Sequence, residues 1–360
     1  MTPNPRSRVR TRLRPVTLGA AAVLLAAHFG ALAHAQAAQG VTIRAAYGYD
    51  YMPATHVDLL AQAGFNRLLV HWIPDSLDSA GAAHLRDLVD RGSVRGVEIV
   101  PEWLLQQRAR LAARPLSRRY TWGRARVETD VACPLDSLYW RSALLDRAEE
   151  WLTADARIRH LAVDLELLGA GRSHYNGGPC CCSSCIAEYA HGRQEILRRD
   201  PAELSGLMPY EESRIAAMLR GLLTEFMTRY PGVELGVLDL DLDSFVHRAF
   251  ARALARRRTP TVDYTESTYS TGAASLGAAR TRLDRLGLRG VPLIAGLWLK
   301  RFNPSRLSAE VRGLNRARNG YFVFTTYSLW QSPALLKGPY TLQGAPGDYW
   351  RALGEANTSP

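Results

Sequence analysis

The chain has 360 residues, of which 47% are hydrophobic and 22% are charged. This composition is ordinary for a folded globular protein, and it excludes a disordered chain, a collagen-like fibre and a coiled coil. The formal net charge is +11, but five of the arginines lie within the first fourteen residues. The other arginines are scattered between acidic residues, so the charge pattern indicates no nucleic-acid partner.

The N-terminus has the pattern of a secretory signal peptide. A basic stretch is followed by an apolar run over 16–33 and by the cleavage motif Ala33-His34-Ala35. We therefore predict a signal peptide over 1–35 and a secreted or periplasmic mature chain over 36–360. An uncleaved anchor is the alternative, because the run is about long enough to span a bilayer. No later stretch is comparably apolar, so we expect no stable membrane anchor after cleavage.

The mature chain alternates predicted strands and helices eight times. The strands are expected over 41–52, 66–73, 97–105, 160–168, 233–240, 261–269, 291–299 and 320–330. The helices are expected over 55–63, 79–91, 137–154, 184–199, 209–230, 244–257, 274–286, 305–318 and 348–356. Eight such units predict one α/β domain over 36–360, a (β/α)8 TIM barrel with enlarged loops after its third and fourth strands.

A doubly wound open sheet is the alternative fold. That fold requires a glycine-rich phosphate loop after the first strand. The segment 47–56 reads YGYDYMPATH and contains no such loop. The barrel is therefore favoured, and no organic cofactor is expected.

Polar and aromatic residues recur at the predicted strand ends. The candidate substrate-binding residues are Tyr49, His71, Trp72, Glu102, Asp239, Glu266, Trp298, Tyr327 and Trp330. The C-terminal strand ends of such a barrel carry its active site. Carboxylates between aromatic rings suit a sugar, which has an apolar face and a rim of hydroxyl groups. The pattern predicts a carbohydrate cleft.

The fourth strand, LAVDLELLG over 161–169, carries the sharpest pair of acids. Alternation places Val163 and Leu165 towards the helices, and Asp164 and Glu166 inside the barrel. Two carboxylates inside a barrel are costly unless they have partners or a function. We interpret Glu166 as a general acid/base and Asp164 as its partner or the nucleophile. Arginine partners or a structural ion are the alternative explanation.

Ordinary glycoside hydrolysis needs a second carboxylate across the cleft. In the sixth strand, parity with Thr261 and Thr265 predicts that Asp263 faces inward and is the third catalytic candidate. Glu266 has the opposite parity unless it already lies in the loop. Asp241 is interpreted as a cap of the following helix.

The five cysteines give a second signal. Cys133 precedes the third helix, and GGPCCCSSCIAEY follows the fourth strand. The C-x-C-x-x-C spacing of Cys180, Cys182 and Cys185, with Cys133 as a fourth ligand, predicts a structural zinc site. Cys181 is left over. Disulfides are the alternative, because a secreted protein meets an oxidising compartment.

These cysteines resemble the zinc cluster of the family 42 β-galactosidases, and PCCCSSCIAEY is similar to a stretch found in many barrel glycosidases. The Asp-x-Glu of the fourth strand is similar to chitinase-like and lysozyme-like barrels, in which the Glu protonates the glycosidic oxygen. An acid on strand four paired with one on strand six resembles the α-galactosidase-like clan. These resemblances imply a barrel glycoside hydrolase. The family 42 nucleophile is a Glu ending strand seven, and here GLWLKRF at 296–302 contains none.

The sequence as a whole predicts a secreted glycoside hydrolase that cleaves O-glycosidic bonds of an oligo- or polysaccharide. The alternative is a carbohydrate-binding barrel that does not catalyse, which the missing glutamate on strand seven favours. A third interpretation is a metal-dependent hydrolase that uses His71, Asp164, Glu166 and Asp263. No His-x-His or His-Glu-x-x-His spacing supports it.

Overall fold

The computed structural model describes most of residues 42–360. The described residues are 42–74, 76–105, 109–115, 117–121, 124–128, 131–165, 179–190, 206–242, 244–255, 260–330 and 337–358. The predicted signal peptide over 1–35 lies outside them. Within these ranges no helix combines the length and the apolar character that a membrane crossing requires.

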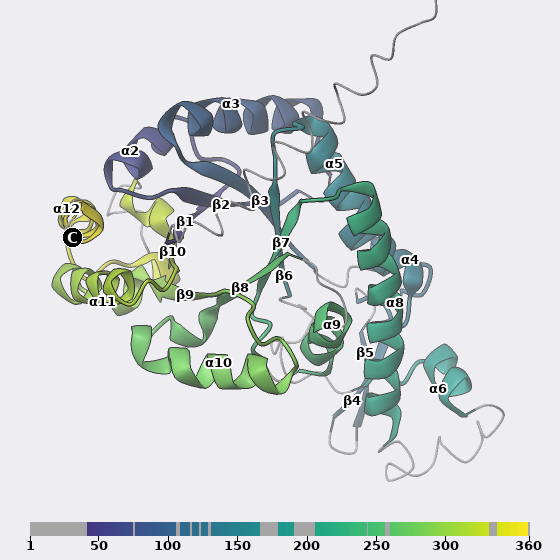
Figure 1. The fold of residues 1–360 in the computed structure, drawn as a ribbon. Coiled ribbons are helices and arrows are strands. Elements are labelled where there is room, and N and C mark those ends of the chain that lie inside the picture. The colour runs from purple at the N-terminus through teal and green to yellow at the C-terminus, as the bar shows by residue number, and fades with distance from the viewer. Residues whose placement is uncertain are drawn as a thin grey trace, which may run out of the picture. The chain divides into compact units, whose positions relative to one another are not determined.

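Eight parallel strands close into a barrel, as Figure 1 shows. They are β1 (Arg44–Tyr49), β2 (Arg67–His71), β3 (Glu98–Leu104), β6 (His160–Asp164), β7 (Glu234–Leu238), β8 (Thr261–Thr265), β9 (Leu293–Trp298) and β10 (Tyr321–Phe324). Each strand pairs with its neighbour along the chain, and β10 pairs with β1. The predicted TIM barrel is confirmed.

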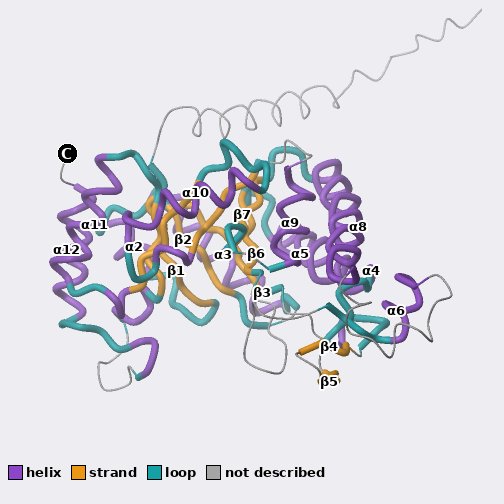
Figure 2. Tube along the Cα trace, turned by 90° about the horizontal axis from the view of Figure 1, so that it is seen from below, coloured by secondary structure: helices purple, strands orange, loops and turns teal. Residues whose placement is uncertain are grey.

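Helices surround these strands, as Figures 1 and 2 show. They are α2 (His56–Gln62), α3 (Ser79–Arg95), α4 (Ser137–Trp140), α5 (Arg147–Ala154), α6 (Ser183–Ala190), α8 (Leu207–Arg229), α9 (Phe245–Ala255), α10 (Leu276–Arg285), α11 (Pro304–Arg316) and α12 (Pro346–Thr358). A π-helical stretch, η2 (Arg141–Asp146), joins α4 to α5, so the helix predicted over 137–154 contains one widened turn.

Local sequence explains where several helices begin and end. The Asp78 carboxylate accepts the Gly81 N–H at the start of α3, and Gly96 ends that helix with a φ of 69°. The Asn303 side chain caps α11 in the same way, and Pro304 follows as its first residue.

A two-stranded hairpin was not predicted. β4 (Ser117–Thr121) and β5 (Arg124–Glu128) pair antiparallel within the segment that we expected to be a polar loop. The hairpin lies on the same side of the barrel as α6 (Figures 1 and 2).

Alternation along the strands separates two cores. The inner core contains Ala45, Tyr47, Leu69, Val100, Ala162, Leu238, Val262, Tyr264, Ile294 and Phe322. The outer core lies between strands and helices and includes Val163 and Leu165. This split confirms the predicted alternation for the described part of the fourth strand.

Charged residues fill the N-terminal end of the barrel interior. We call Arg67, Glu98, His160 and Glu234 the basal cluster, because each begins its strand. The Arg67 guanidinium lies 2.7 Å from Glu98 Oε2 and donates to the Tyr264 hydroxyl at 2.8 Å. His160 contacts Glu98 and lies 3.1 Å from Glu234 Oε1. Every member therefore has a partner of opposite charge, as buried charges require.

The basal cluster shifts the pKa values of its members. Burial favours the neutral form of His160, but hydrogen bonds to Glu234 and Glu98 outweigh burial and raise its pKa above 6.5. Burial also opposes the charge of Glu98, but Arg67 and His160 lower its pKa to about 2. The imidazolium therefore stabilises the fold below pH 6.5, and this contribution is lost as the pH rises through the folded-state pKa.

We expect His160→Gln to cost about 1–2 kcal/mol of unfolding free energy at pH 5.5, because hydrogen bonds to a charged group are lost. The cost should be smaller at pH 8. Chemical denaturation of both proteins at the two pH values measures the difference. His247→Gln is a matched control, because burial lowers the pKa of His247 to about 4 and it stays neutral at both. An equal cost of His160→Gln at the two pH values would contradict the assignment.

Candidate functional site

The C-terminal ends of the barrel strands bring the predicted polar residues together. Strand register places Tyr49 beside His71 and His71 beside Glu102. Asp164 ends β6, and Trp298 ends β9 beside Phe324. Asp239 and Glu266 directly follow β7 and β8. We call this ring of side chains the barrel mouth.

Glu102 organises one side of the barrel mouth. Its side chain is fully buried, and His71 Nδ1 lies 2.7 Å from its Oε2 atom. The Tyr47 hydroxyl donates to the same oxygen at 3.0 Å. Within the described residues Glu102 Oε1 is buried without a hydrogen-bond partner. Glu102 therefore fixes the His71 ring while keeping one oxygen available.

Asp239 and Glu266 form the opposite side. Asp239 is 1% exposed and has a φ of 64°, a left-handed conformation that is uncommon for residues other than glycine. Its Oδ1 atom accepts the Glu266 N–H at 2.7 Å. Burial raises the pKa of Asp239 well above 3.8, and the charges of Glu266 and Asp164 raise it further. Strain of this kind is concentrated at functional sites.

The same acids act on two buried tyrosines. Burial raises the pKa of Tyr47, with Glu102 and Asp164 adding to the shift. Burial likewise raises the pKa of Tyr269, followed by the charges of Glu266 and Asp239. The acids of β3, β6, β7 and β8 thus face one shared space. Tyr47 and Tyr269 were not among the predicted site residues. Tyr47 lies within β1, and Tyr269 follows the short helical turn after β8.

Asp263 does not face this space, so its predicted inward orientation is wrong. Val262 and Tyr264 occupy the inner core, which turns Asp263 towards the helices. Its Oδ1 atom accepts the Leu240 N–H at 3.1 Å. Burial raises the pKa of Asp263, and nearby Asp241 raises it further. Glu266 begins the short helical turn that directly follows β8, and its charge acts on Asp239 and Tyr269 at the barrel mouth. Glu266 therefore replaces Asp263 as the candidate acid from this part of the chain.

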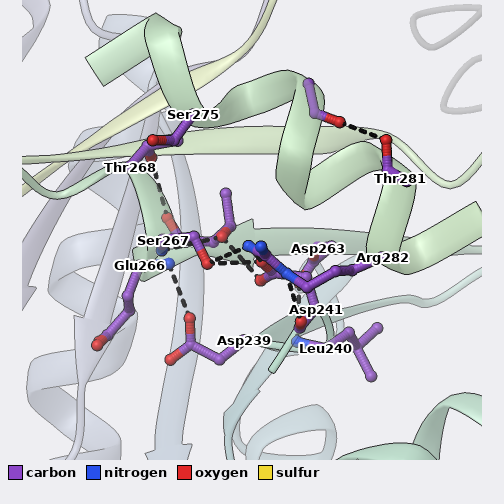
Figure 3. Close-up of polar contacts among 12 residues, drawn as sticks. Asp239, Leu240, Asp241, Asp263, Glu266, Ser267, Thr268, Ser275, Thr281 and Arg282 are labelled. Carbon is purple, nitrogen blue, oxygen red and sulfur yellow. Dashed lines mark hydrogen bonds and ion pairs between the residues drawn. The ribbon is translucent and has the colours of Figure 1, made fainter. Parts of the chain in front are cut away.

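Asp241 anchors the turn that carries Glu266, and it is not a helix cap. Its carboxylate accepts hydrogen bonds from Thr265 Oγ1 at 2.8 Å, Ser267 Oγ at 2.6 Å and the Arg282 guanidinium at 2.6 Å. In Figure 3 the Glu266 side chain points away from this group, on the side of Asp239. The Asp241 carboxylate, paired with Arg282, thus holds Thr265 and Ser267, the residues on either side of Glu266.

The predicted sugar-lining aromatic residues divide into two groups. The Tyr49 ring lies 5.0 Å from that of Tyr327, and the Trp298 ring lies 6.0 Å from Tyr269. Trp72 instead packs against Trp151 in the outer core at 4.8 Å. Trp330 stacks on His56 at 3.9 Å, also in the outer core. Trp72 and Trp330 are therefore outside the barrel mouth, and Glu166 lies outside the described residues.

Four cysteine sulfurs meet in a second cluster. Cys133 Sγ lies 3.1 Å from Cys185 Sγ and 3.9 Å from those of Cys180 and Cys182. All five cysteines are free thiols. Tetrahedral zinc with sulfur ligands at about 2.3 Å requires sulfurs about 3.8 Å apart, which these separations approach. The donor set and its spacing thus fit a four-coordinate metal ion.

The surroundings of the cysteine cluster support this interpretation. The Cys180 N–H donates to Glu211 Oε2 at 3.0 Å. Burial raises the pKa of Glu211 to about 9, with the neighbouring Cys180 adding to the shift. Cys181 lies apart, with its sulfur 3.8 Å from the Pro179 carbonyl oxygen. The cluster joins the segment before α4, which carries Cys133, to the start of α6, because Cys180 and Cys182 precede that helix and Cys185 lies in its first turn.

Comparisons with known proteins give the fold. No protein-family model and no curated protein sequence matches the chain. A GH138 enzyme targeting pectin rhamnogalacturonan II is similar at a TM-score of 0.50 and 11% identity, over 88% of this chain and 48% of that one. A glycoside hydrolase family 5 enzyme from Prevotella bryantii B14 has a TM-score of 0.48 and 11% identity, over 85% and 86% of the two chains.

An O-GlcNAc hydrolase from Thermobaculum terrenum is similar at a TM-score of 0.43 and 9% identity, over 88% of this chain. The present chain spans 63% of that protein and about half of the GH138 enzyme. The similarity to the GH138 enzyme agrees with the closed (β/α)8 barrel that the strand pairing shows. The resemblance of its cysteines to the family 42 site stays a prediction.

Asp239→Asn should raise the free energy of unfolding at pH 8 by about 1 kcal/mol or more, because asparagine removes a buried charge and tolerates the left-handed conformation. Because the pKa of Asp239 is higher in the folded than in the unfolded state, the wild type loses stability as the pH rises above 3.8. The increase in unfolding free energy caused by Asp239→Asn should therefore be smaller at pH 4.5 than at pH 8. Denaturant titrations at both pH values measure it.

Asp58→Asn serves as a control that should change the free energy of unfolding in the opposite direction. Hydrogen bonds from Arg91 lower the pKa of Asp58 to about 2, so its loss should destabilise the protein at pH 8. A decrease in stability for Asp239→Asn at pH 8 would show that the Asp239 carboxylate is not under strain.

Proposed function

We propose that the chain is a secreted glycoside hydrolase that cleaves O-glycosidic bonds of an oligo- or polysaccharide. One observation carries this proposal: Asp164, Asp239 and Glu266 gather at the barrel mouth, and one of them has a strongly raised pKa. Glycoside hydrolysis needs a carboxyl group that keeps its proton close to one that carries negative charge. The signal pattern over 1–35 supports the secreted location.

The roles follow from position. Glu266 takes the role of the second carboxylate, because it directly follows β8 and its charge acts on Asp239 at the barrel mouth. Asp164 acts as partner of Glu166, which stays the sequence-based candidate for the general acid/base. Asp239 positions Glu266, because its Oδ1 atom accepts the backbone N–H of Glu266. Tyr49, Tyr327 and Trp298 supply ring faces for the sugar.

We also propose that Cys133, Cys180, Cys182 and Cys185 hold one structural zinc ion. Four thiolates complete the coordination of zinc and leave no open position for substrate or water. The ion would join the segment before α4 to the start of α6. Its contribution is therefore to stability, and the reaction is assigned to the carboxylates.

Turnover by the mature chain tests the catalytic assignment. Hydrolysis of a panel of polysaccharides and aryl glycosides is expected for residues 36–360. Glu266→Gln, Asp164→Asn and Glu166→Gln should each lower kcat by about 10²–10⁴-fold, the usual contribution of a proton-transfer group. Initial rates at fixed enzyme concentration measure the loss.

Asp263→Asn is the matched control for turnover, because Asp263 faces the helices and asparagine can still accept the Leu240 N–H. It should keep activity within about threefold of the wild type. Full activity of Glu266→Gln would refute the assignment. Glycan binding by the wild type without any turnover would identify a carbohydrate-binding barrel.

Metal content tests the zinc proposal. The purified chain should contain one zinc ion, and Cys185→Ser should lose it and about 2–4 kcal/mol of stability, the typical effect of removing a cross-link. Cys181→Ser is the control and should keep both. Elemental analysis and thermal melting measure these effects. A metal-free chain with two disulfides in its intact mass would contradict the proposal.

A further inference from the structure

A pocket of about 420 Å³ lies between the ends of β2 and β3 and the helical segment η2–α5. His71, Trp72 and Ile73 form one wall, at the end of β2. Ser142, Asp146 and Arg147 form the facing wall, on the helical segment. The pocket lies beside the barrel mouth and shares His71 with it. The function proposed above makes no use of this pocket.

The π-helical stretch η2 shapes the facing wall. π-helical turns are rare and are found frequently at functional sites. The Trp103 Nε1–H donates to the Ala143 carbonyl at 2.8 Å, which ties the end of β3 to this turn. Ser142, Ala143 and Asp146 of the turn line the pocket. The widened turn is thus part of the wall and is held in place by the barrel.

Hydrogen bonds also fix the polar groups of the pocket. Glu102 holds the His71 ring at 2.7 Å. The Arg147 guanidinium lies 4.7 Å from the centre of the Trp151 ring and donates to Glu150 at 2.8 Å. Arg147 is therefore already paired with an acid of the same pocket. Asp146 is likewise paired, because Arg141 Nε lies 3.9 Å from its Oδ1 atom. An anionic ligand would have to displace one of these carboxylates from its arginine, so the walls disfavour it.

Apolar surface makes up the rest of the lining. Trp72, Ile73, Trp103, Leu104 and Leu111 all contribute to it. Ile73 is 53% exposed although it is a large hydrophobic residue. Apolar walls with a few fixed polar groups are typical of small-molecule sites, and this volume lies within their usual range of roughly 300–1,000 Å³.

We propose that this pocket is a binding subsite for a neutral sugar unit of the glycan, next to the barrel mouth. The proposal rests on the glycoside hydrolase function for the identity of the ligand. It adds the substrate class: the unit bound here is uncharged. His71 joins the subsite to the barrel mouth, and Ile73 offers the apolar surface on which a sugar ring packs.

Calorimetric titration of the mature chain with cellohexaose, xylohexaose, mannohexaose, chitohexaose and hexagalacturonate tests the subsite. At least one neutral hexasaccharide should bind at least about tenfold more tightly than hexagalacturonate. Ser142→Trp fills the pocket and should weaken that binding about tenfold or more. Ser93→Trp, on the exposed face of α3, is the matched control and should bind like the wild type.

Ile73→Ala gives a second variant that spares the fold, because Ile73 is half exposed. It should weaken binding about threefold to tenfold with an unchanged melting temperature. Wild-type affinity in both Ser142→Trp and Ile73→Ala would overturn the proposal, as would equal or tighter binding of hexagalacturonate. Failure to bind any neutral hexasaccharide would also overturn it.

The two proposals fail in different ways. If the subsite is wrong but the catalytic assignment is right, Ser142→Trp hydrolyses the long glycan like the wild type while Glu266→Gln does not. If the catalytic assignment is wrong, Glu266→Gln keeps the wild-type rate, and the loss of hexasaccharide binding in Ser142→Trp still supports the subsite.

Discussion

The closed barrel imposes one constraint on the rest of the structure: every second side chain of each strand must lie inside it, away from water. Polar groups in that interior require partners. At the N-terminal end the requirement is met, because the charges of Arg67, Glu98, His160 and Glu234 balance one another. At the other end burial and the charges of Glu266 and Asp164 raise the pKa of Asp239. This asymmetry separates a stabilising end of the barrel from the end at which we propose the site.

The connection between β7 and β8 shows how the active end is maintained. Asp239 adopts a strained conformation and carries a carboxyl group whose ionisation is suppressed. Asp241, two residues later, is fully compensated by Thr265, Ser267 and Arg282. The neighbouring ion pair therefore supplies the rigidity that the strained residue needs. Stability and reactivity are assigned to different residues of one short segment.

The order of strands and helices could be predicted from sequence, because the repeat of short apolar runs and amphipathic helices is strong. Orientation was predicted correctly for Asp164 but not for Asp263. In β6 the large apolar residues face outward, towards the helices. In β8 the large apolar residues Val262 and Tyr264 face inward. A strand buried on both faces has no polar face to mark its direction, so alternation alone cannot orient it.

Other features depend on tertiary contacts that no local pattern contains. The cysteine spacing indicated the four-sulfur cluster, but its closure depends on Cys133 reaching a segment 47 residues away. Trp72 and Trp330 have side chains typical of sugar sites, yet their rings pack against Trp151 and His56 and not at the barrel mouth. Trp72 instead lines the pocket beside η2. The pocket beside η2 depends on a widened helical turn, and the 3.6-residue period over 137–154 gave no sign of it.

That widened turn has a consequence for how such a protein can diverge. A π-helical turn holds about one more residue per turn than an α-helical turn does. Deleting a single residue from 141–146 would restore a continuous α-helix and remove the widened turn from the pocket wall, while the two flanks keep nearly the same rotation. The strands and the acids at their ends would stay where they are. A one-residue length difference could therefore separate chains that share the same chemistry but accept glycans of different shape.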